Sequence, residues 1–358
     1  MARRKLLLLL KPFDVFPVRQ SNANGVSHIT NPQVFQHLDN RCKVHKDAIN
    51  FCQDILSRKS VDWEPVFRNS YSKPISNVDL VVTIGGDGTL LQASHLMDDS
   101  VPVLGVNSDP THVEEVEAFS NEFDATRSTG YLCAATVKNF EQVVKGCCWY
   151  LVEGRNHGGL LIYMPKLNTL IYMQQETCFI IWHCFQVIDK ILDGQLVPSI
   201  LSRISVCVNS EQLPTFALND ILVAHPCPAT VSRFSFKINK DSLPCSPLVN
   251  CRSSGLRVST AAGSTAAMLS AGGFIMPTLS QDLQYMVREP ISPPAAYSNL
   301  MHGLVKSDES MEATWFSKEG FIYIDGSHIF HSIQNGDTIE LSSKAPGLKV
   351  FLPPHLFS

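Results

Sequence analysis

The sequence predicts an α/β N-terminal domain with a Rossmann-like open sheet, followed by a β-rich C-terminal domain. Three observations lead to this fold class. Strand-like apolar runs alternate with helix-like segments in the first part, a glycine-rich turn joins one such run to a helix, and short strand-like runs separated by Pro, Asn and Ser fill the later part. Because 358 residues exceed one ordinary core, two domains are expected. We place them at 1–125 and 126–358, with a C-terminal tail that could return to the first domain.

The N-terminal elements follow from the spacing of apolar residues. Residues 6–10 are consecutive leucines and predict a buried strand, because a signal peptide needs ~7–15 apolar residues and a cleavage site. Apolar residues at helical spacing predict a helix over 32–59. The next expected elements are a strand at 78–84, a helix at 90–97 and a strand at 101–106. A strand–helix–strand of this length is typical of a parallel βαβ unit.

The later part is predicted to be mostly antiparallel, because its apolar runs are short and bounded by turn residues. Residues 321–324 run into Asp325-Gly326, and Asn335-Gly336 is a further hairpin signal. Strands are expected at 202–208, 217–223, 231–238 and 255–259.

Composition excludes several classes of protein. The formal net charge of −4 gives no electrostatic reason to expect nucleic acid or an anionic membrane as a partner. No run approaches the ~20 apolar residues of a membrane span, and Leu356-Phe357-Ser358 is not the Ser-Lys-Leu peroxisomal signal. We therefore expect a cytoplasmic protein. Eleven cysteines without C-x-x-C or H-E-x-x-H spacing predict free thiols rather than disulfides or zinc.

Gly85-Gly86-Asp87-Gly88-Thr89 is the first motif that carries chemistry. It follows a predicted strand, at the edge where ligands of open α/β sheets bind. Its glycines let the backbone approach a polyphosphate, and its N–H groups and those of the next helix form an anion site. The Asp87 carboxylate suits a base for a hydroxyl or a magnesium partner. The alternative is a tight turn with Asp87 as a helix N-cap. Neither P-loop spacing nor G-x-G-x-x-G occurs.

Two further clusters lie in the later part. Asn219-Asp220 interrupts an apolar strand, so the pair either marks a strand end or offers hydrogen bonds to ribose hydroxyls. Residues 255–267, continuing to 270–273, are dense in Gly, Ala, Ser and Thr. Such small residues indicate either close strand–helix packing or a nucleotide lying over backbone amides and small hydroxyls.

Taken in chain order, these three motifs resemble the NAD kinases, and the sequence around them is most similar to that of plant NADH kinases. The first motif alone is shared with lipid kinases and phosphofructokinases. The resemblance implies an active site between the two domains, the second of which binds the dinucleotide, and a homo-oligomer such as a dimer. It also implies phosphate transfer from ATP to the 2′-hydroxyl of the adenosine ribose of NADH, NAD or both, with Mg²⁺ or another divalent cation.

The resemblance also assigns roles to single residues. Asp87 is the expected catalytic carboxylate, as base or as metal partner. Gly88 is expected to line the substrate, and Asn219 and Asp220 to contact it. The residues expected to bind ATP or the dinucleotide are Gly85, Gly86, Gly88, Thr89, Asn219, Asp220, Gly263, Ser264, Thr265, Ala266 and Ser270.

The chain departs from the family pattern at three positions. Many members carry Glu where this chain has Asp220, Asp where it has Ser254, and Tyr where it has Ala267. These departures leave the preferred form of the substrate open. Three lone histidines near apolar segments are expected to be surface or satisfied core residues: His95, His112 and His225.

Residues 144–186 do not fit the pattern. The family resemblance resumes when they are removed, and 136–143 and 187–194 then read as one helix. Val144-Lys145 can be encoded as a splice donor and Phe185-Gln186 as a splice acceptor, so we interpret the block as a translated, retained intron. The alternative is a genuine insertion loop, although structureless loops of this length are uncommon in compact domains.

Two other functions compete with the kinase prediction. A lipid kinase of the diacylglycerol or sphingosine type would share the first motif, but the other two motifs and the lack of a membrane-binding stretch disfavour it. A dinucleotide-binding protein made inactive by the inserted block would bind NADH without forming product.

Overall fold

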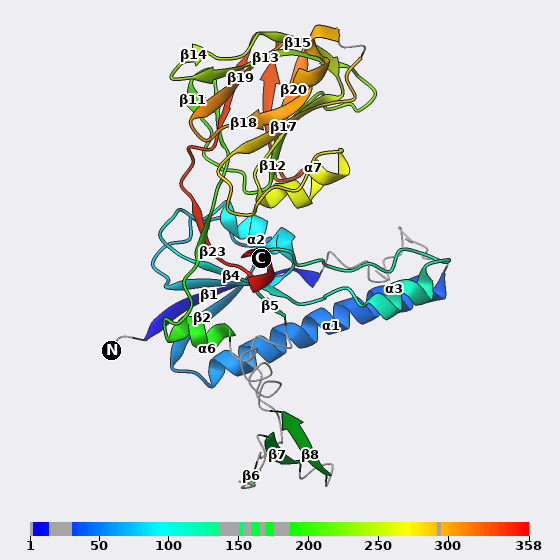
Figure 1. Ribbon diagram of the computed structural model, residues 1–358, viewed down its shortest axis with the longest axis vertical. Helices are drawn as coiled ribbons and strands as arrows, with labels where there is room; N and C mark the ends of the chain where they lie inside the picture. Colours follow the sequence, from blue (N-terminus) through cyan, green and yellow to red (C-terminus); the bar gives the residue numbers. More distant parts are fainter. Residues whose placement is uncertain are drawn as a thin grey trace.

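The computed structural model describes residues 3–13, 31–136, 150–152, 159–164, 169–174, 187–291 and 295–357. Figure 1 shows an α/β half and a β-rich half stacked along the long axis of the molecule, with two chain crossings between them. The first crossing runs from β9 (Ser199–Leu201) to β10 (Ser205–Val208), and the second from β22 (Thr338–Ser342) to β23 (Leu348–Phe351). The fold class predicted from the sequence is confirmed.

One sheet forms the α/β half, with strand order β2-β1-β3-β4-β23-β9, and β5 also pairs with β4. All pairs are parallel except β23 with β9. Because the sheet takes in β5, β9 and β23, it draws on residues beyond 125; the domain boundary placed there stays a prediction. The remaining strands are β1 (Arg4–Leu10), β2 (Val61–Phe67), β3 (Leu80–Gly85), β4 (Val103–Asn107) and β5 (Ala135–Thr136).

The leucines of β1 supply two separate cores. Every second leucine, beginning with Leu6, packs with α1 (Pro32–Ser57) and α6 (Val187–Leu192). The leucines between them, beginning with Leu7, pack with α2 (Asp87–Ser94) on the opposite face. Successive side chains of a strand point to opposite faces, so a run of apolar residues requires cover on both. Full burial stabilises the fold by roughly 1.5–3 kcal/mol per leucine.

The ends of α1 lie close to their predicted positions. Its N-cap is Asn31, whose Oδ1 accepts the N–H of Gln33 at 2.9 Å, and Pro32 occupies the first helical position, where its missing N–H costs nothing. The described residues of this half also include α3 (Val113–Phe119) and the 3₁₀ turn η4 (Pro354–Phe357).

Two antiparallel sheets form the β-rich half and pack face to face as a sandwich. Their orders are β11-β10-β22-β19-β13-β14, with β15 beside β13, and β18-β17-β16-β12-β20-β21. Trp315, Phe236 and Ile221 are buried in the core between them. The further elements are β11 (Glu211–Gln212), β12 (Asp220–Ala224), β13 (Ser232–Lys240), β14 (Leu243–Pro244), β15 (Val249–Ser253), β16 (Gly255–Ser259), η2 (Ala262–Thr265), α7 (Ala267–Ser270), β17 (Leu283–Arg288), η3 (Ala295–Leu300), β18 (His302–Val305), β19 (Glu309–Trp315), β20 (Glu319–Ile324) and β21 (Ile329–Gln334).

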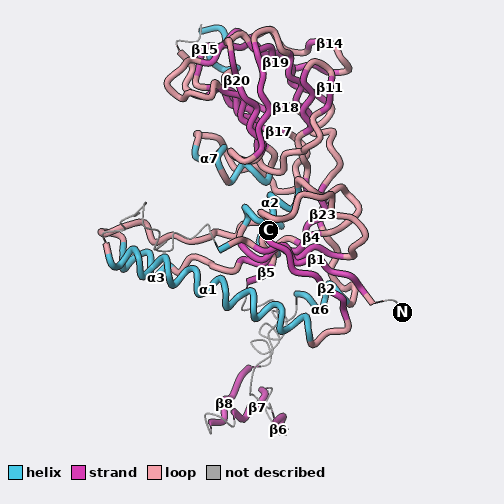
Figure 2. Tube along the Cα trace, turned by 180° about the vertical axis from the view of Figure 1, so that it is seen from behind, coloured by secondary structure: helices cyan, strands magenta, loops and turns pink. Residues whose placement is uncertain are grey.

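The atypical block contributes a small antiparallel sheet, β6-β7-β8. Its strands are β6 (Tyr150–Val152), β7 (Gly159–Met164) and β8 (Thr169–Gln174). Figures 1 and 2 both show this sheet apart from the two main halves. The rest of 144–186, and nearly all of the helix start expected at 136–143, lie outside the described residues. The retained-intron interpretation therefore stays a prediction.

Within the described ranges, the helices are too short or too polar to cross a membrane. The seven cysteines that the structure describes are all free thiols, in agreement with their irregular spacing.

Candidate active site

The glycine-rich turn, residues 85–89, joins β3 to α2 at the carboxyl edge of the parallel sheet. Neighbouring side chains explain its first two glycines. A Cβ on Gly85 would lie 2.2 Å from Thr89 Oγ1, and a Cβ on Gly86 would lie 2.1 Å from Ser128 Oγ. Carbon atoms do not approach hydroxyls so closely, so a larger residue at either position would require these hydroxyls to rotate away and would still be tightly packed.

The third glycine of the turn has open space around it. Of the described atoms, only Arg68 Nη1 would lie within 4 Å of a Cβ on Gly88, at 3.7 Å. Gly88 is exposed and belongs to the first turn of α2, where backbone N–H groups have no partner within a helix. This side of the turn can therefore admit an anion.

Asp87 is the first residue of α2 and does not cap it. The N-cap is Gly86. The Asp87 carboxylate instead accepts the backbone N–H groups of Tyr131 at 2.8 Å and Leu132 at 2.9 Å. The N-cap alternative for Asp87 is thus wrong, because the carboxylate reaches a distant loop rather than its own helix. Thr129 Oγ1 at 3.5 Å and Cys133 Sγ at 3.7 Å also donate to its two oxygens, so a hydroxyl or a metal would replace one of these longer contacts.

Asp325 organises the second motif. Its Oδ1 accepts the N–H groups of Asn219 at 2.7 Å and Asp220 at 2.9 Å, and its Oδ2 accepts that of Leu218 at 2.8 Å. The same Oδ2 lies 2.8 Å from Nε2 of His95, the C-cap of α2. The sequence indicated only a turn at Asp325, and its positive φ of 51° agrees with one. Its contacts are far apart in sequence, so no local pattern reports them.

The third motif packs directly on the second. Thr260 donates its N–H to the carbonyl of Asn219 at 2.9 Å, and Ser259 Oγ donates to the same carbonyl at 3.1 Å. A Cβ on Gly263 would lie 2.1 Å from that carbonyl oxygen. Close packing therefore explains part of the small-residue composition of this segment. This was one of the two interpretations of the sequence; the other was a bound nucleotide.

Asp220 and Arg257 form a buried ion pair beside this contact. Burial raises the pKa of Asp220 to about 6, although the Arg257 guanidinium opposes the rise. Two atoms of the group, Asn219 Oδ1 and Arg257 Nε, are buried and have no hydrogen-bond partner among the described residues. Such atoms cost roughly 1–3 kcal/mol each unless a ligand or water satisfies them.

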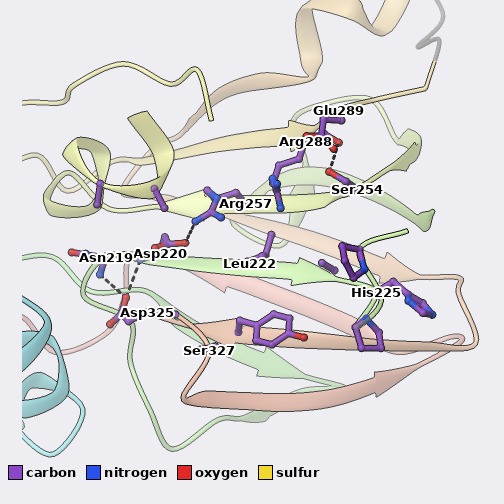
Figure 3. Close-up of a pocket in the computed structure, with 17 residues that line it drawn as sticks. Asn219, Asp220, Leu222, His225, Ser254, Arg257, Arg288, Glu289, Asp325 and Ser327 are labelled. Atoms are coloured by element: carbon purple, nitrogen blue, oxygen red, sulfur yellow. Dashed lines mark hydrogen bonds and ion pairs between the residues drawn. The ribbon is translucent and has the colours of Figure 1, made fainter. Parts of the chain in front are cut away.

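These residues line a cavity of about 820 Å³ in the β-rich half. Figure 3 shows it running along β12 and β16, from Asn219 and Asp325 at one end to His225 at the other. Arg257 and Arg288 approach from the β16 and β17 side. The three family departures, Asp220, Ser254 and Ala267, all line this cavity.

The structure brings some predicted site residues together and keeps others apart. Asn219, Asp220 and Ala266 line the cavity, whereas the glycine-rich turn does not. The two regions meet through a buried cluster in which Leu90 of α2 packs with Leu218 and Ala262. Both views show α2 and α7 facing each other between the halves (Figures 1 and 2).

The predicted hydroxyl contacts are only partly available. Ser264 Oγ is buried, donates to the Ala261 carbonyl at 2.6 Å and accepts the Met276 N–H at 2.9 Å. Thr265 Oγ1 donates to the Ala262 carbonyl at 3.2 Å. Both hydroxyls thus stabilise the η2–α7 turn in this structure. Ser270 is exposed at the end of α7, and its hydroxyl stays available.

The three histidines differ in environment. His95 is half-buried, and its Nε2 pairs with Asp325. Its Nδ1 is buried without a hydrogen-bond partner among the described residues, so it is not the satisfied core histidine that was expected. His112 is exposed at the start of α3. His225 lines the cavity, and its Nδ1 accepts the Cys227 N–H at 3.0 Å, so it is a wall residue held by its own loop.

The described ranges hold no group of three or more His, Cys, Asp or Glu side chains arranged for a metal. A protein cage for Mg²⁺ is therefore missing from this part of the chain, and Asp87 is the acidic side chain placed beside the open turn.

Known proteins resemble the chain in family, sequence and fold. Residues 6–112 match the family described as "ATP-NAD kinase N-terminal domain". A "Probable NADH kinase" of Oryza sativa subsp. japonica is 52% identical over 364 residues, covering 99% of this chain and 98% of the relative. An "NADH kinase" of Arabidopsis thaliana is 57% identical over 353 residues, covering 98% and 96%.

Two solved structures share the fold. An NAD kinase from Archaeoglobus fulgidus in complex with ATP superposes with a TM-score of 0.55 at 16% identity, covering 99% of this chain and 95% of its own. Yeast NADH kinase complexed with NADH superposes with a TM-score of 0.57 at 14% identity, covering 97% and 83%. These two structures show the fold, and the identity to the plant relatives over nearly the whole chain shows that this protein is a member of the NAD kinase family.

Proposed function

We propose that the protein transfers a phosphoryl group from ATP to the 2′-hydroxyl of the adenosine ribose of NADH, NAD or both, giving NADPH or NADP. The observation that carries this proposal is the convergence of the three motifs. Leu90, directly after the glycine-rich turn, shares a buried cluster with Leu218 and Ala262, which flank the dinucleotide cavity. ATP bound at the turn and the ribose bound in the cavity would then lie on either side of the start of α2, close enough for phosphoryl transfer.

The cavity supplies groups suited to an adenosine and its ribose. Asn219 Oδ1 is an acceptor without a described partner, and Asp220 offers a carboxylate already oriented by Arg257. Ligand donors that satisfy these atoms would recover the cost of burying them. Ala267 occupies a wall position where a tyrosine of other members would project, so the cavity has room there for a different form of the dinucleotide.

Asp87 is proposed as the catalytic carboxylate. Its two backbone contacts hold it in one orientation at the start of α2, beside the open side of the turn. Phosphoryl transfer depends mainly on alignment and charge stabilisation rather than covalent work by the protein. A fixed carboxylate that exchanges its longer contacts with Thr129 and Cys133 can accept the hydroxyl proton or help to hold a cation.

Magnesium fits this site as a companion of ATP. Mg²⁺ usually keeps several waters and binds through one or two carboxylates together with substrate phosphates. Asp87 provides one such carboxylate, and the described residues provide no cage that would hold the ion alone. When bound, the cation would neutralise charge on the phosphates.

A homo-oligomer such as a dimer and a cytoplasmic location are also proposed, through family resemblance. Light scattering would test the first and cell fractionation the second.

A coupled assay tests the function. The purified full-length chain is incubated with ATP, Mg²⁺ and either NADH or NAD, and NADP(H) is measured. A variant lacking residues 144–186 is assayed in parallel. Product from both proteins supports the proposal and shows that the block is tolerated. Product from the shortened chain alone would make the block inhibitory, and silence of both would reject a dinucleotide as the substrate, after which lipid acceptors presented in liposomes would be tested.

A further inference from the structure

Two basic residues follow the strands that flank the glycine-rich turn. Lys11 comes directly after β1, and Arg68 directly after β2. Lys11 donates its N–H to the Ile84 carbonyl at 3.0 Å, and Arg68 donates its N–H to the Leu10 carbonyl at 3.0 Å. The carboxyl ends of three neighbouring parallel strands, β2, β1 and β3, therefore place a lysine, an arginine and the turn at one edge of the sheet.

The Arg68 side chain contacts the turn, and the Cβ of Lys11 lies beside it. Arg68 Nη1 donates to Thr89 Oγ1 at 3.3 Å, and it is the atom nearest the open side of Gly88. The Cβ of Lys11 would lie 3.1 Å from a Cβ on Gly85. The arginine guanidinium and the base of the lysine side chain thus border the turn from adjacent strands.

Lys11 lies close to other positive charges. Burial, and next the nearby Arg41 guanidinium, lower the pKa of Lys11, and Arg68 adds to the decrease while Asp109 opposes it. Asp109 binds Arg41 at 2.9 Å, so part of its charge is already engaged. Crowding of like charges costs energy, which a bound polyanion would recover.

A buried histidine fixes this arrangement. His45 Nε2 lies 2.9 Å from the Lys11 carbonyl, and its Nδ1 lies 2.7 Å from Ser108 Oγ. Ser108 in turn donates its N–H to the Gly85 carbonyl at 2.8 Å. The backbone that carries Lys11 and the backbone of the turn are therefore held by one network, so the lysine and the turn are positioned together.

We infer that Lys11 and Arg68 bind the triphosphate of the nucleotide donor, clamping it against the backbone of residues 85–89. This inference rests on the proposed function and deepens it by assigning the charge partners of the donor. A lysine acts as a compact point charge, whereas the guanidinium of arginine can bind two phosphate oxygens at once. Neither residue belongs to a motif that the sequence analysis identified, because each follows a strand that is distant in sequence from the turn.

The test compares Lys11→Met and Arg68→Met with the matched control Lys46→Met. Lys46 is exposed on α1, so its loss changes net charge equally without touching the turn. Two quantities are measured: the KM for ATP and for NADH in the kinase assay, and the Kd for inorganic tripolyphosphate by calorimetry. We expect either variant to raise the KM for ATP and the tripolyphosphate Kd by about 10- to 100-fold. The KM for NADH and the Lys46→Met values should change less than about twofold.

The outcomes separate this inference from the proposed function. If wild type binds tripolyphosphate and the two variants lose that binding, the clamp stands even when no NADP(H) forms. If product forms normally but both variants keep the ATP KM and tripolyphosphate Kd of wild type, the clamp is wrong and the kinase function survives. Lys11→Arg and Arg68→Lys keep the charge and should retain most of the affinity. Equal losses in these conservative variants and in the Met variants would point to damaged folding and contradict the inference.

Discussion

His95 and Asp325 connect the two halves of the protein, with His95 Nε2 lying 2.8 Å from Asp325 Oδ2. His95 caps the carboxyl end of α2, the helix that begins at Asp87. Asp325 binds the backbone of Asn219 and Asp220. One carboxylate therefore couples the helix that carries the proposed catalytic residue to the pair proposed to bind the dinucleotide.

Removing that carboxylate should weaken both structure and substrate binding. In Asp325→Asn, one oxygen becomes an amide donor that faces backbone N–H groups, leaving buried groups unpaired. We expect a loss of roughly 2–4 kcal/mol in the free energy of unfolding and a raised KM for NADH, with the KM for ATP less affected. Thermal denaturation and kinetics measure the two effects. His95→Gln is the matched control, because its amide can still donate to Asp325; equal damage in both variants would contradict this role of the carboxylate.

Asp87→Asn should separate catalysis from folding only in part. Loss of the carboxylate should lower turnover by at least ~10²–10⁴-fold, the usual contribution of general-base assistance. The contacts with Tyr131 and Leu132 add a cost to folding, because one carboxylate oxygen is replaced by a donor that faces a backbone N–H. We therefore expect about 1–3 kcal/mol of destabilisation as well. Turnover measured well below the melting temperature isolates the chemical effect, and near-normal turnover there would remove Asp87 from the mechanism.

The three glycines of the turn should respond differently to alanine. Gly85→Ala and Gly86→Ala place a Cβ near 2 Å from the hydroxyls of Thr89 and Ser128, which must rotate away, and should destabilise the protein by roughly 1–3 kcal/mol. Gly88→Ala meets only Arg68, and alanine favours a helix by up to ~1 kcal/mol over glycine. It should fold with wild-type or slightly higher stability while raising the KM for ATP. If Gly88→Ala were as unstable as Gly85→Ala and Gly86→Ala, the turn would not be open at Gly88.

The affinity for the dinucleotide should depend on pH through Asp220. Its pKa is raised to about 6, mainly by burial, so the carboxylate gains a proton as pH falls from 7 to 5. The protonated form loses charge toward Arg257 and lone pairs for the ribose, so the KM for NADH should rise across this range. Asp220→Asn should have a high KM at pH 7 and a flatter profile. An unchanged wild-type pH profile in Asp220→Asn would exclude this carboxylate as the titrating group.

The raised pKa of Asp220 favours low pH for stability, whereas it favours high pH for binding of the dinucleotide. Because the folded-state pKa lies above the ordinary value of 3.8, the folded protein binds the proton more tightly than the unfolded chain. The contribution of Asp220 to stability is therefore fully present below pH 3.8 and is lost as pH rises through about 6. The difference in melting temperature between wild type and Asp220→Asn should follow this trend, and a difference that grows toward low pH in favour of Asn would contradict it.

The sequence predicted those features that local patterns encode. The five leucines of β1 require a strand buried on both faces, and the turn at 85–89 marks the carboxyl edge of a parallel sheet. β2 escaped prediction although its side chains alternate as in a half-buried strand, because Pro65 argues against a strand interior and only an edge strand tolerates it. Asp325 and Lys11 escaped because their partners are distant in sequence. The local sequence pattern showed only a turn at Asp325 and only the end of an apolar run at Lys11.

The most direct test of the central claim identifies the atom that receives the phosphate. The full-length chain is incubated with ATP, Mg²⁺ and NADH, and the product is examined by phosphorus-31 NMR against authentic NADPH. The account predicts one new monoester resonance that matches the 2′-phosphate and is absent with Asp87→Asn. A phosphate on any other hydroxyl, or undiminished product from the Asp87→Asn protein, would contradict it.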